Sequence, residues 1–321
     1  MKKKNVYLIL IIVIAGIILL YSVKKYLFKN KVNINDKTVL YMSAYSSWLQ
    51  YALDYDGWNL WLQSGDRVKC ITKGGFYSQP CWSPDKDMLA FCSYRKTKPD
   101  NCLDYRCLNF FIWVMSPDGK IEYSITPPNL SSQCPDWSGD GEKIVFQAVP
   151  FRPDIKKEQN YSLYITDPVG AEINKLELND SVSFQQPCFA PDNQRVVAIG
   201  TDVQGTGLYI IDIITLTYIE VYSADDKSFI SSPDWHPTNQ DLITFINNGN
   251  IQIIDLETSK ITQLTSDGWC EEPSWASDGT VILFTRMKNN TTEQIFKIDI
   301  STGQEEKITN LKGSCVFPIG H

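Results

Sequence analysis

Apolar residues along this chain fall into short runs, and polar turns separate the runs at regular intervals. A Pro-x-aromatic step stands about nine residues before each of five such runs. The steps are Pro80-Cys81-Trp82, Pro135-Asp136-Trp137, Pro187-Cys188-Phe189, Pro233-Asp234-Trp235 and Pro273-Ser274-Trp275, followed by a degenerate Cys315-Val316-Phe317. Successive aromatics lie 55, 52, 46, 40 and 42 residues apart. This spacing is close to the roughly 40 to 50 residues of a propeller blade.

Each repeated unit contains the residues of four short strands. A turn such as Ser83-Pro84-Asp85 follows the step, and an apolar run such as Ile144-Val145-Phe146 follows the turn. A third run often ends on aspartate, as in Leu208-Tyr209-Ile210-Ile211-Asp212, and a fourth is shorter, as in Leu264-Thr265. Turns of this composition join antiparallel strands. Four strands in each unit predict an all-β propeller.

The two ends of the repeat region complement each other. The first unit lacks its opening step, but Val39-Leu40-Tyr41, Leu60-Trp61-Leu62 and Cys70-Ile71-Thr72 can form its second to fourth strands. Cys315-Val316-Phe317 supplies the missing first strand. We therefore predict a six-bladed β-propeller closed by pairing of the C-terminal strand with the N-terminal blade, an arrangement that leaves no free sheet edge at the junction. Loss of the last ten residues should open this ring.

The motifs resemble a known family. A Pro-x-Trp-Ser-Pro-Asp step, an apolar-x-Phe strand and an Ile/Leu-Tyr-x-x-Asp strand are similar to the TolB-type propeller repeat, which is related in architecture to WD repeats. The resemblance covers residues 38–321 and implies the fold. Similar repeats occur in periplasmic translocation factors, in peptidase accessory domains and in some lyases, so the resemblance does not fix the function.

The N-terminal region predicts a membrane anchor. Residues 1–5 form a short basic flank, residues 6–23 contain no charge and are rich in Ile, Leu and Val, and residues 24–37 form a juxtamembrane tether. Eighteen apolar residues just span a bilayer. A cleavable signal peptide is the alternative, but Tyr21-Ser22-Val23-Lys24-Lys25 has no small-residue cleavage site.

Lysines flank the apolar segment on both sides, so the positive-inside rule does not decide its orientation. The family resemblance implies an exported propeller. We therefore expect a single-pass membrane protein with a cytoplasmic N-terminus and a periplasmic or extracellular propeller.

The charge is unevenly distributed. Residues 1–31 contain seven lysines and no acidic residue, which leaves 23 basic against 37 acidic residues in the rest of the chain. A propeller region with a formal charge of 14 negative is poorly suited to nucleic acid or anionic lipid. We expect no nucleic-acid partner.

The nine cysteines permit several interpretations. Cys102 and Cys107 have a spacing that a disulfide could close if the domain is exported. Cys81, Cys134, Cys188 and Cys315 fall on or next to predicted first strands, where a ring of metal ligands and simple apolar packing are the alternatives. Packing is favoured because these four residues lie in separate blades without close Cys-x-x-Cys spacing. We predict no metal.

Catalytic motifs are hard to find. Of the two histidines, His236 lies in a turn and His321 is the last residue. No Gly-x-Ser-x-Gly or His-Glu-x-x-His sequence is present. We therefore expect neither enzymatic activity nor a cofactor.

The predicted loops between second and third strands are long in the first three blades, at residues 45–58, 94–109 and 150–160, and short in the fifth. In a propeller these loops share a face with the connections that enter each first strand. Aromatic, arginine, amide and carboxylate side chains there resemble binding anchors. The predicted partner-binding residues are Trp48, Tyr51, Tyr55, Gln79, Arg95, Tyr105, Arg106, Phe151, Arg152, Gln186, Glu271 and Glu272.

The leading interpretation is a membrane-anchored, monomeric, non-enzymatic propeller that binds a protein or peptide partner in the cell envelope through the loop-rich face and the channel mouth. The alternative is a carbohydrate-active enzyme or glycan-binding sensor that uses carboxylates at the channel mouth. That alternative needs two acids within about 5 to 10 Å of each other.

Overall fold

A computed structural model describes residues 38–44, 58–64, 66–72, 76–94, 108–151, 160–288, 292–309 and 314–319. All of them lie in one compact unit, Asn35–His321. The predicted membrane span at residues 6–23 lies outside the described residues. Within the described ranges, no helix is long and apolar enough to cross a membrane.

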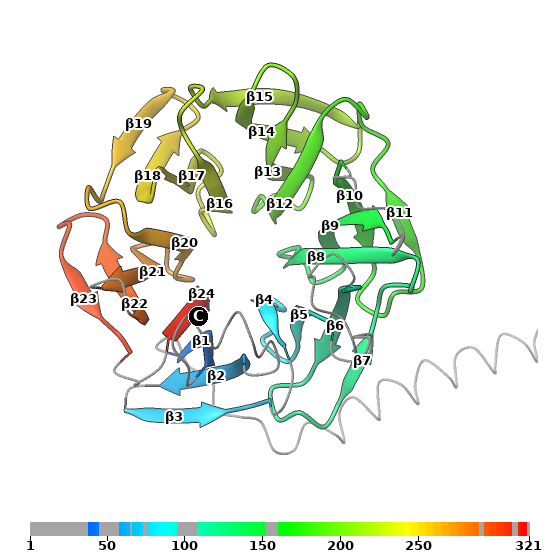
Figure 1. The fold of residues 1–321 in the computed structure, drawn as a ribbon, viewed down its shortest axis with the longest axis horizontal. Coiled ribbons are helices and arrows are strands. Elements are labelled where there is room, and N and C mark those ends of the chain that lie inside the picture. The colour runs from blue at the N-terminus through cyan, green and yellow to red at the C-terminus, as the bar shows by residue number, and fades with distance from the viewer. Residues whose placement is uncertain are drawn as a thin grey trace, which may run out of the picture. The chain divides into compact units, whose positions relative to one another are not determined.

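The described residues form 24 strands in six four-stranded sheets, which are arranged around a central axis as the blades of a propeller (Figure 1). Blade 1 contains β24 (Ser314–Ile319), β1 (Thr38–Ala44), β2 (Asn59–Ser64) and β3 (Arg67–Cys70). Blade 2 contains β4 (Ser78–Trp82), β5 (Leu89–Ser93), β6 (Phe111–Met115) and β7 (Glu122–Ser124). Blade 3 contains β8 (Leu130–Trp137), β9 (Ile144–Pro150), β10 (Ser162–Thr166) and β11 (Ile173–Lys175). Blade 4 contains β12 (Ser183–Phe189), β13 (Arg195–Thr201), β14 (Thr206–Asp212) and β15 (Thr217–Ser223). Blade 5 contains β16 (Ile230–Trp235), β17 (Leu242–Asn247), β18 (Asn250–Asp255) and β19 (Lys260–Gln263). Blade 6 contains β20 (Cys270–Trp275), β21 (Val281–Lys288), β22 (Thr292–Asp299) and β23 (Glu305–Lys307). The predicted all-β, six-bladed architecture is thereby confirmed.

Neighbouring strands within each blade are antiparallel. In blade 4, for example, β13 and β14 pair from Arg195↔Asp212 to Thr201↔Thr206. In blade 1, β24 pairs with β1 through Cys315↔Ser43. The first and last strands of the described chain therefore share one sheet.

Every innermost strand contains a bulge next to its proline. The register shifts at this point in all six blades, as happens when one strand of a pair holds an extra residue. The residue before the proline is left-handed in each case, with φ between 50° and 53°. These residues are Gln79, Cys134, Gln186, Ser232, Glu272 and Phe317.

The bulges correct the sequence register of the last unit. The sixth proline step begins at Pro318, so Phe317 takes the place of Gln79 or Glu272 and not that of the repeated aromatic. Gly320 stands two residues after this proline, where the other five units have Trp or Phe. Because Gly320 is not aromatic, the sequence pattern aligns on Phe317, which lies three residues before the true position.

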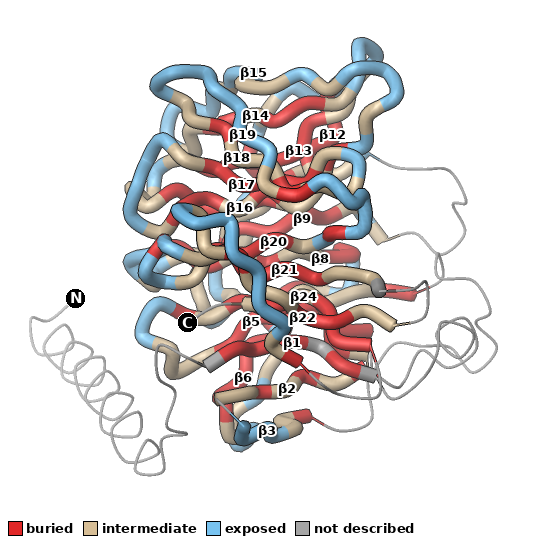
Figure 2. The backbone as a smooth tube through the Cα atoms, turned by 90° about the vertical axis from the view of Figure 1, so that its left-hand side faces the viewer, coloured by how far each residue is buried: buried red, intermediate tan, exposed pale blue. Residues whose placement is uncertain are grey.

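The core lies between adjacent blades. Figure 2 shows buried stretches following the strands and exposed stretches concentrated at turns. Trp137 of blade 3 packs with Ala90 and Val114 of blade 2, and Trp235 of blade 5 packs with Val197 of blade 4. The repeated aromatics therefore fill the spaces between blades.

The turn after each repeated aromatic is held by side-chain hydrogen bonds. In blade 3, Lys143 N donates to Ser138 Oγ at 2.9 Å, and Ser138 Oγ donates to Asp140 Oδ1 at 2.6 Å. The indole Nε1 of Trp137 donates to the carbonyl of Gly141 at 3.2 Å. The Ser-x-Asp turns therefore act as hairpin-forming elements, as expected from their composition.

Candidate functional site

The six innermost strands converge on the propeller axis and enclose a cavity of about 130 Å³. Each blade contributes its proline and one residue on either side of it. The lining residues are Gln79–Cys81, Cys134–Asp136, Gln186–Cys188, Ser232–Asp234, Glu272–Ser274 and Phe317–Ile319. We call the residues before the prolines the upper ring and those after them the lower ring.

The upper ring lies nearer the face where connections enter the innermost strands, which we call the entry face. Two glutamines of this ring join consecutive blades. Cys134 N donates to Gln79 Oε1 at 3.0 Å, and Ser232 N donates to Gln186 Oε1 at 2.7 Å. The bulge makes this possible because it turns the pre-proline side chain toward the next blade.

The amide nitrogens of the two glutamine side chains are hydrogen-bond donors as well. The Gln79 side-chain amide is also hydrogen-bonded to the Cys134 thiol group, whereas Nε2 of Gln186 donates to no acceptor among the described residues. Both residues line the cavity. The cavity wall therefore offers the Gln186 amide as a donor that a bound molecule could satisfy.

Glu272 supplies the carboxyl group of the upper ring. Its Oε2 accepts a hydrogen bond from Phe317 N at 2.6 Å and one from Thr285 Oγ1 at 2.9 Å. Burial, with smaller contributions from the charges of Glu271 and Glu293, raises the pKa of Glu272 to about 8. At neutral pH this carboxyl is therefore mostly protonated and can donate a hydrogen bond.

The lower ring contains two aspartates that also join blades. Phe189 N donates to Asp136 Oδ2 at 2.7 Å, and Trp275 N donates to Asp234 Oδ2 at 2.6 Å. A second cavity, of about 270 Å³, extends from this ring toward the opposite face, which we call the turn face. The lower ring borders both cavities, and its members are Cys81, Asp136, Cys188, Asp234, Ser274 and Ile319.

Cys188 lies between the two aspartates. Its thiol donates to Asp234 Oδ1 at 3.4 Å, and its sulfur accepts a hydrogen bond from Trp235 N at 3.3 Å. Burial raises the pKa of Asp136 to about 6 and that of Asp234 to about 7, with the charge of Asp136 adding to the second shift. Burial likewise raises the pKa of the Cys188 thiol, which makes it a poor nucleophile at neutral pH.

The four cysteines considered for a metal ring do not share one level of the channel. Cys81 and Cys188 belong to the lower ring and Cys134 to the upper ring, whereas Cys315 packs between blades 6 and 1. Among the described residues, no group of three or more His, Cys, Asp or Glu side chains is arranged to hold a metal ion.

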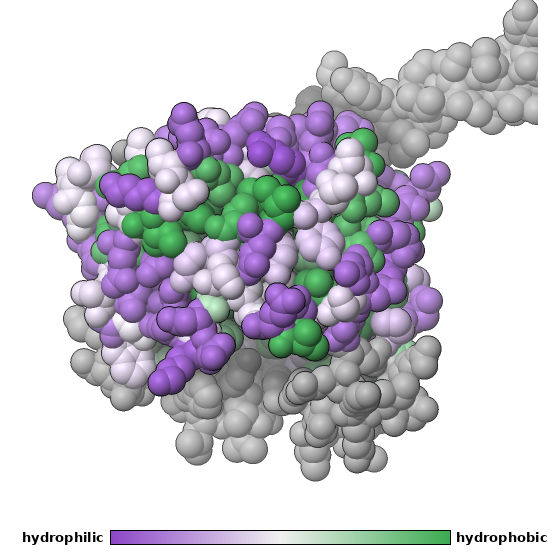
Figure 3. All heavy atoms as spheres, turned by 90° about the horizontal axis from the view of Figure 1, so that it is seen from above, coloured by the Kyte–Doolittle hydropathy of each residue, from purple (hydrophilic) through white to green (hydrophobic). Residues whose placement is uncertain are grey.

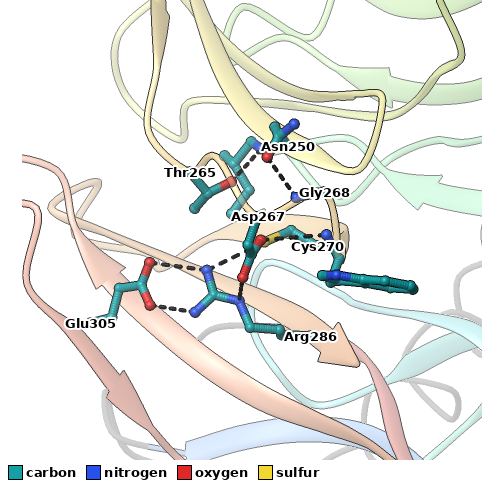
Figure 4. Close-up of polar contacts among 9 residues, drawn as sticks. Asn250, Thr265, Asp267, Gly268, Cys270, Arg286 and Glu305 are labelled. Carbon is teal, nitrogen blue, oxygen red and sulfur yellow. Dashed lines mark hydrogen bonds and ion pairs between the residues drawn. The ribbon is translucent and has the colours of Figure 1, made fainter. Parts of the chain in front are cut away.

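An ion-pair cluster lies in blade 6 at the connection that leads from β19 into β20 (Figure 4). Arg286 pairs with Glu305 and, at 2.9 Å, with Asp267, while its Nη2 donates to Cys270 Sγ at 3.5 Å. The guanidinium also lies over the Phe284 ring, 4.9 Å from its centroid. These contacts hold the connection that leads into β20, the strand that carries Glu271 and Glu272.

The structure brings part of the predicted site together. Gln79, Gln186 and Glu272 line the upper ring, and Glu271 is exposed beside it. Phe151 follows β9, and its N–H donates to Asn129 O at 2.8 Å just before β8. The remaining predicted residues, Trp48, Tyr51, Tyr55, Arg95, Tyr105, Arg106 and Arg152, and the Cys102–Cys107 pair lie outside the described residues.

The sequence prediction missed Asp136 and Asp234 as members of the site, although both stand in its Pro-Asp-Trp steps. Their direction depends on the bulge one residue earlier, and a strand pattern without that bulge does not place them. The available signal was the aspartate that directly follows proline in two of the steps, because aspartate is uncommon within strands.

Comparisons with known proteins agree with this architecture. The family model for the TolB beta propeller domain matches residues 149–318. A comparison with curated protein sequences gave no significant match. Among solved structures, TolB from Acinetobacter baumannii is similar, with a TM-score of 0.68 and 15% sequence identity over 89% of this chain and 67% of that chain.

Two further structures have the same fold. A putative TolB from Agrobacterium tumefaciens has a TM-score of 0.62 and 13% identity, over 87% of this chain and 91% of that chain. An oligogalacturonate lyase in complex with manganese has a TM-score of 0.56 and 15% identity, over 86% of this chain and 79% of that chain. At these identities the similarity concerns the fold alone.

Proposed function

This chain belongs to the TolB beta propeller domain family, and on that premise we propose that it is a membrane-anchored, non-enzymatic propeller that binds a protein or peptide partner in the cell envelope. Binding takes place at the channel mouth and the loops around it on the entry face. The upper ring carries this proposal, because it combines a cavity with a hydrogen-bond donor, Nε2 of Gln186, that has no protein partner among the described residues.

The chemistry of the upper ring favours a peptide. Nε2 of Gln79, Nε2 of Gln186 and the protonated carboxyl of Glu272 are donors around one cavity. A peptide segment or chain end offers carbonyl and carboxylate acceptors for such donors. A cavity of about 130 Å³ holds one side chain or a chain end of such a segment.

Substitution of glutamine by glutamate tests this role sharply. Gln79→Glu and Gln186→Glu keep the oxygen that accepts the neighbouring blade's N–H but remove the amide donor at the cavity wall. We expect both variants of the full-length chain to fold and to lose in-cell photocrosslinking to the partner from a probe at Phe151. Gln240→Glu makes the same charge change in an exposed turn on the other face and should crosslink as the unaltered chain does. Equal crosslinking by all three variants would overturn the proposal.

The membrane arrangement is part of the same proposal. Residues 6–23 span the bilayer, residues 24–37 form the tether, and the propeller at residues 38–321 lies in the periplasm or outside the cell, with the N-terminus in the cytoplasm. The apolar run and its lysine flanks support the span. Protease treatment of intact cells or spheroplasts should digest the propeller from outside. Full protection in spheroplasts would contradict this orientation.

The ring is proposed to be held shut by the pairing of β24 with β1. Cys315 packs in the core between blades 6 and 1, and the Phe317 N–H reaches Glu272 of blade 6. These contacts join the end of the chain both to the first blade and to the last.

A second candidate function rests on the carboxyl groups near the mouth. Glu271, Glu272 and Glu293 interact electrostatically, and burial raises the pKa of Glu293 as well. Neighbouring carboxyls with raised pKa values are used by carbohydrate-active enzymes. Incubation with an oligosaccharide panel should show turnover that Glu272→Gln abolishes if this candidate is right. The absence of both turnover and binding would exclude this candidate.

A further inference from the structure

The outer strand of blade 4 differs from the other five outer strands in length. β15 has seven residues, whereas β3, β7, β11, β19 and β23 have three or four. Each of these strands is the last of its sheet. The long edge of β15 runs along the circumference of the propeller (Figure 1).

The edge of β15 also carries fewer, for its length, of the charges that protect outer strands from pairing with other chains. Each of the other outer strands carries at least one charged residue in three or four positions: Arg67 and Lys69 in β3, Glu122 in β7, Lys175 in β11, Lys260 in β19 and Glu305, Glu306 and Lys307 in β23. β15 carries only Glu220 in seven residues. The Glu220 carboxylate lies over Gly207 of β14, so it is directed along the sheet.

Apolar side chains surround this edge. Ile219 is 63% exposed, and Ile214 in the turn before β15 is 68% exposed. Ile219 pairs with Ile210, which packs toward blade 5, and Ile261 of β19 pairs with Ile254, which packs toward blade 4. Ile219 and Ile261 therefore face one another across the outer opening between these blades. Figure 3, viewed from the β15 side, shows apolar side chains gathered on this surface.

We propose that β15 pairs antiparallel with β15 of a second copy of this chain. The sequence of the strand is suited to self-pairing about a two-fold axis at Ile219. Such pairing sets Ile219 opposite its counterpart, Tyr218 opposite Glu220 and Thr217 opposite Val221, with no like charges in register. An axis at Glu220 would instead place two carboxylates opposite each other.

This inference departs from the monomer expected from the sequence. The extra residue Val221 between the Tyr209↔Glu220 and Leu208↔Tyr222 pairs bends the strand, so the regular edge is short. A stable dimer usually buries about 800 Å² on each partner, and a single short strand edge buries less than that. We therefore expect a weak dimer that forms at high local concentration. For this reason the first test uses the full-length chain in its own membrane.

A cysteine at the two-fold axis provides the test. In the proposed pair, the Cβ atoms of Ile219 and its counterpart lie about 5 Å apart, a separation that mild oxidation can bridge with little movement. Full-length Ile219→Cys should form a covalent dimer several-fold more than the unaltered chain, which reports the background from its own cysteines. Val203→Cys is fully exposed on the same blade but away from the axis and should remain at background.

A second measurement guards against chance collisions. Sedimentation of the detergent-solubilised full-length chain should show a concentration-dependent dimer that Ile219→Lys abolishes without changing the melting temperature. No covalent dimer from Ile219→Cys, an equal dimer from Val203→Cys, or crosslinking only to a different protein would each overturn the proposal.

Discussion

The Nε2 atom of His236 lies 3.2 Å from the carbonyl oxygen of Gly279, and this contact joins blade 5 to blade 6. The Nδ1 atom of the same ring accepts hydrogen bonds from Thr238 N at 3.2 Å and Asn239 N at 2.9 Å. The neutral ring therefore carries its proton on Nε2 and donates it to Gly279.

In blades 3 and 5, the turn carbonyl at the equivalent position accepts a hydrogen bond from the tryptophan of its own blade. The carbonyl groups of Gly141 and Gln240 accept from the indole groups of Trp137 and Trp235. In blade 6 the equivalent carbonyl belongs to Gly279 and is used by His236. The buried indole N–H of Trp275 has no hydrogen-bond partner among the described residues.

Because of His236, the stability of the folded protein should decrease as the pH falls. Burial lowers its pKa in the folded protein, so the unfolded chain binds a proton more readily. The stabilising contribution is therefore complete above about pH 6.5, the unfolded value, and is lost as pH falls through the lower folded value. His236→Ser introduces the residue found at the equivalent turns of blades 2 and 3. We expect the free energy of unfolding of this variant to be lower than that of the unaltered chain by about 1 kcal/mol at pH 8 and by much less at pH 5, as measured by urea unfolding. A loss independent of pH would contradict this role.

Asp234 should have the opposite pH dependence. Its pKa is about 7 in the folded protein, against 3.8 for the ordinary side chain. The folded state therefore holds its proton more tightly, and stability from this group falls as pH rises from about 4 through 7. Asp234→Asn keeps an oxygen for the Trp275 N–H and cannot ionise. We expect the change in the free energy of unfolding that this substitution causes to be more favourable at pH 8 than at pH 5, by about 1 kcal/mol or more. Asp226→Asn, an exposed control, should show no such difference in thermal melts.

Removal of residues 312–321 should open the ring. The deletion removes β24, the strand that pairs with β1 and donates the Phe317 N–H to Glu272. Without it, the edge of β1 and the apolar core between blades 6 and 1 are exposed to solvent. We expect loss of cooperative unfolding and rapid cleavage in limited proteolysis. Phe317→Ala keeps the strand and should remain resistant, so equal resistance of the deletion would refute closure by β24.

Partner capture should depend on the aromatic and arginine residues predicted in the loops of blades 1 and 3. Simultaneous replacement of Trp48, Tyr55 and Arg152 by alanine should abolish crosslinking of the partner, because such residues supply most of the energy of typical interfaces. The circular dichroism spectrum should be unchanged. Ile214→Ala, on an exposed turn of blade 4, serves as the control and should capture the partner normally.

The sequence was sufficient to predict the blades because proline, aspartate and glycine mark turns by their own backbone preferences. It misplaced the last unit because Gly320 stands where the other units have an aromatic residue. It identified Gln79, Gln186 and Glu272 from their position before proline. It did not reveal that their oxygens join neighbouring blades, because that contact depends on a left-handed residue that a strand pattern does not anticipate. Asp136 and Asp234 were missed for the same reason.

The left-handed bulge in all six innermost strands also has a consequence for engineering. Each non-glycine residue held at φ near 50° costs about 1 to 2 kcal/mol relative to an extended one. The natural chain accepts Gln, Cys, Ser, Glu and Phe at this position on one common backbone. The upper ring is therefore a set of six positions with one backbone conformation around a single pore. A designer could vary the chemistry of that pore by position, provided that any replacement of Gln79, Gln186 or Glu272 keeps an acceptor for the neighbouring blade's N–H.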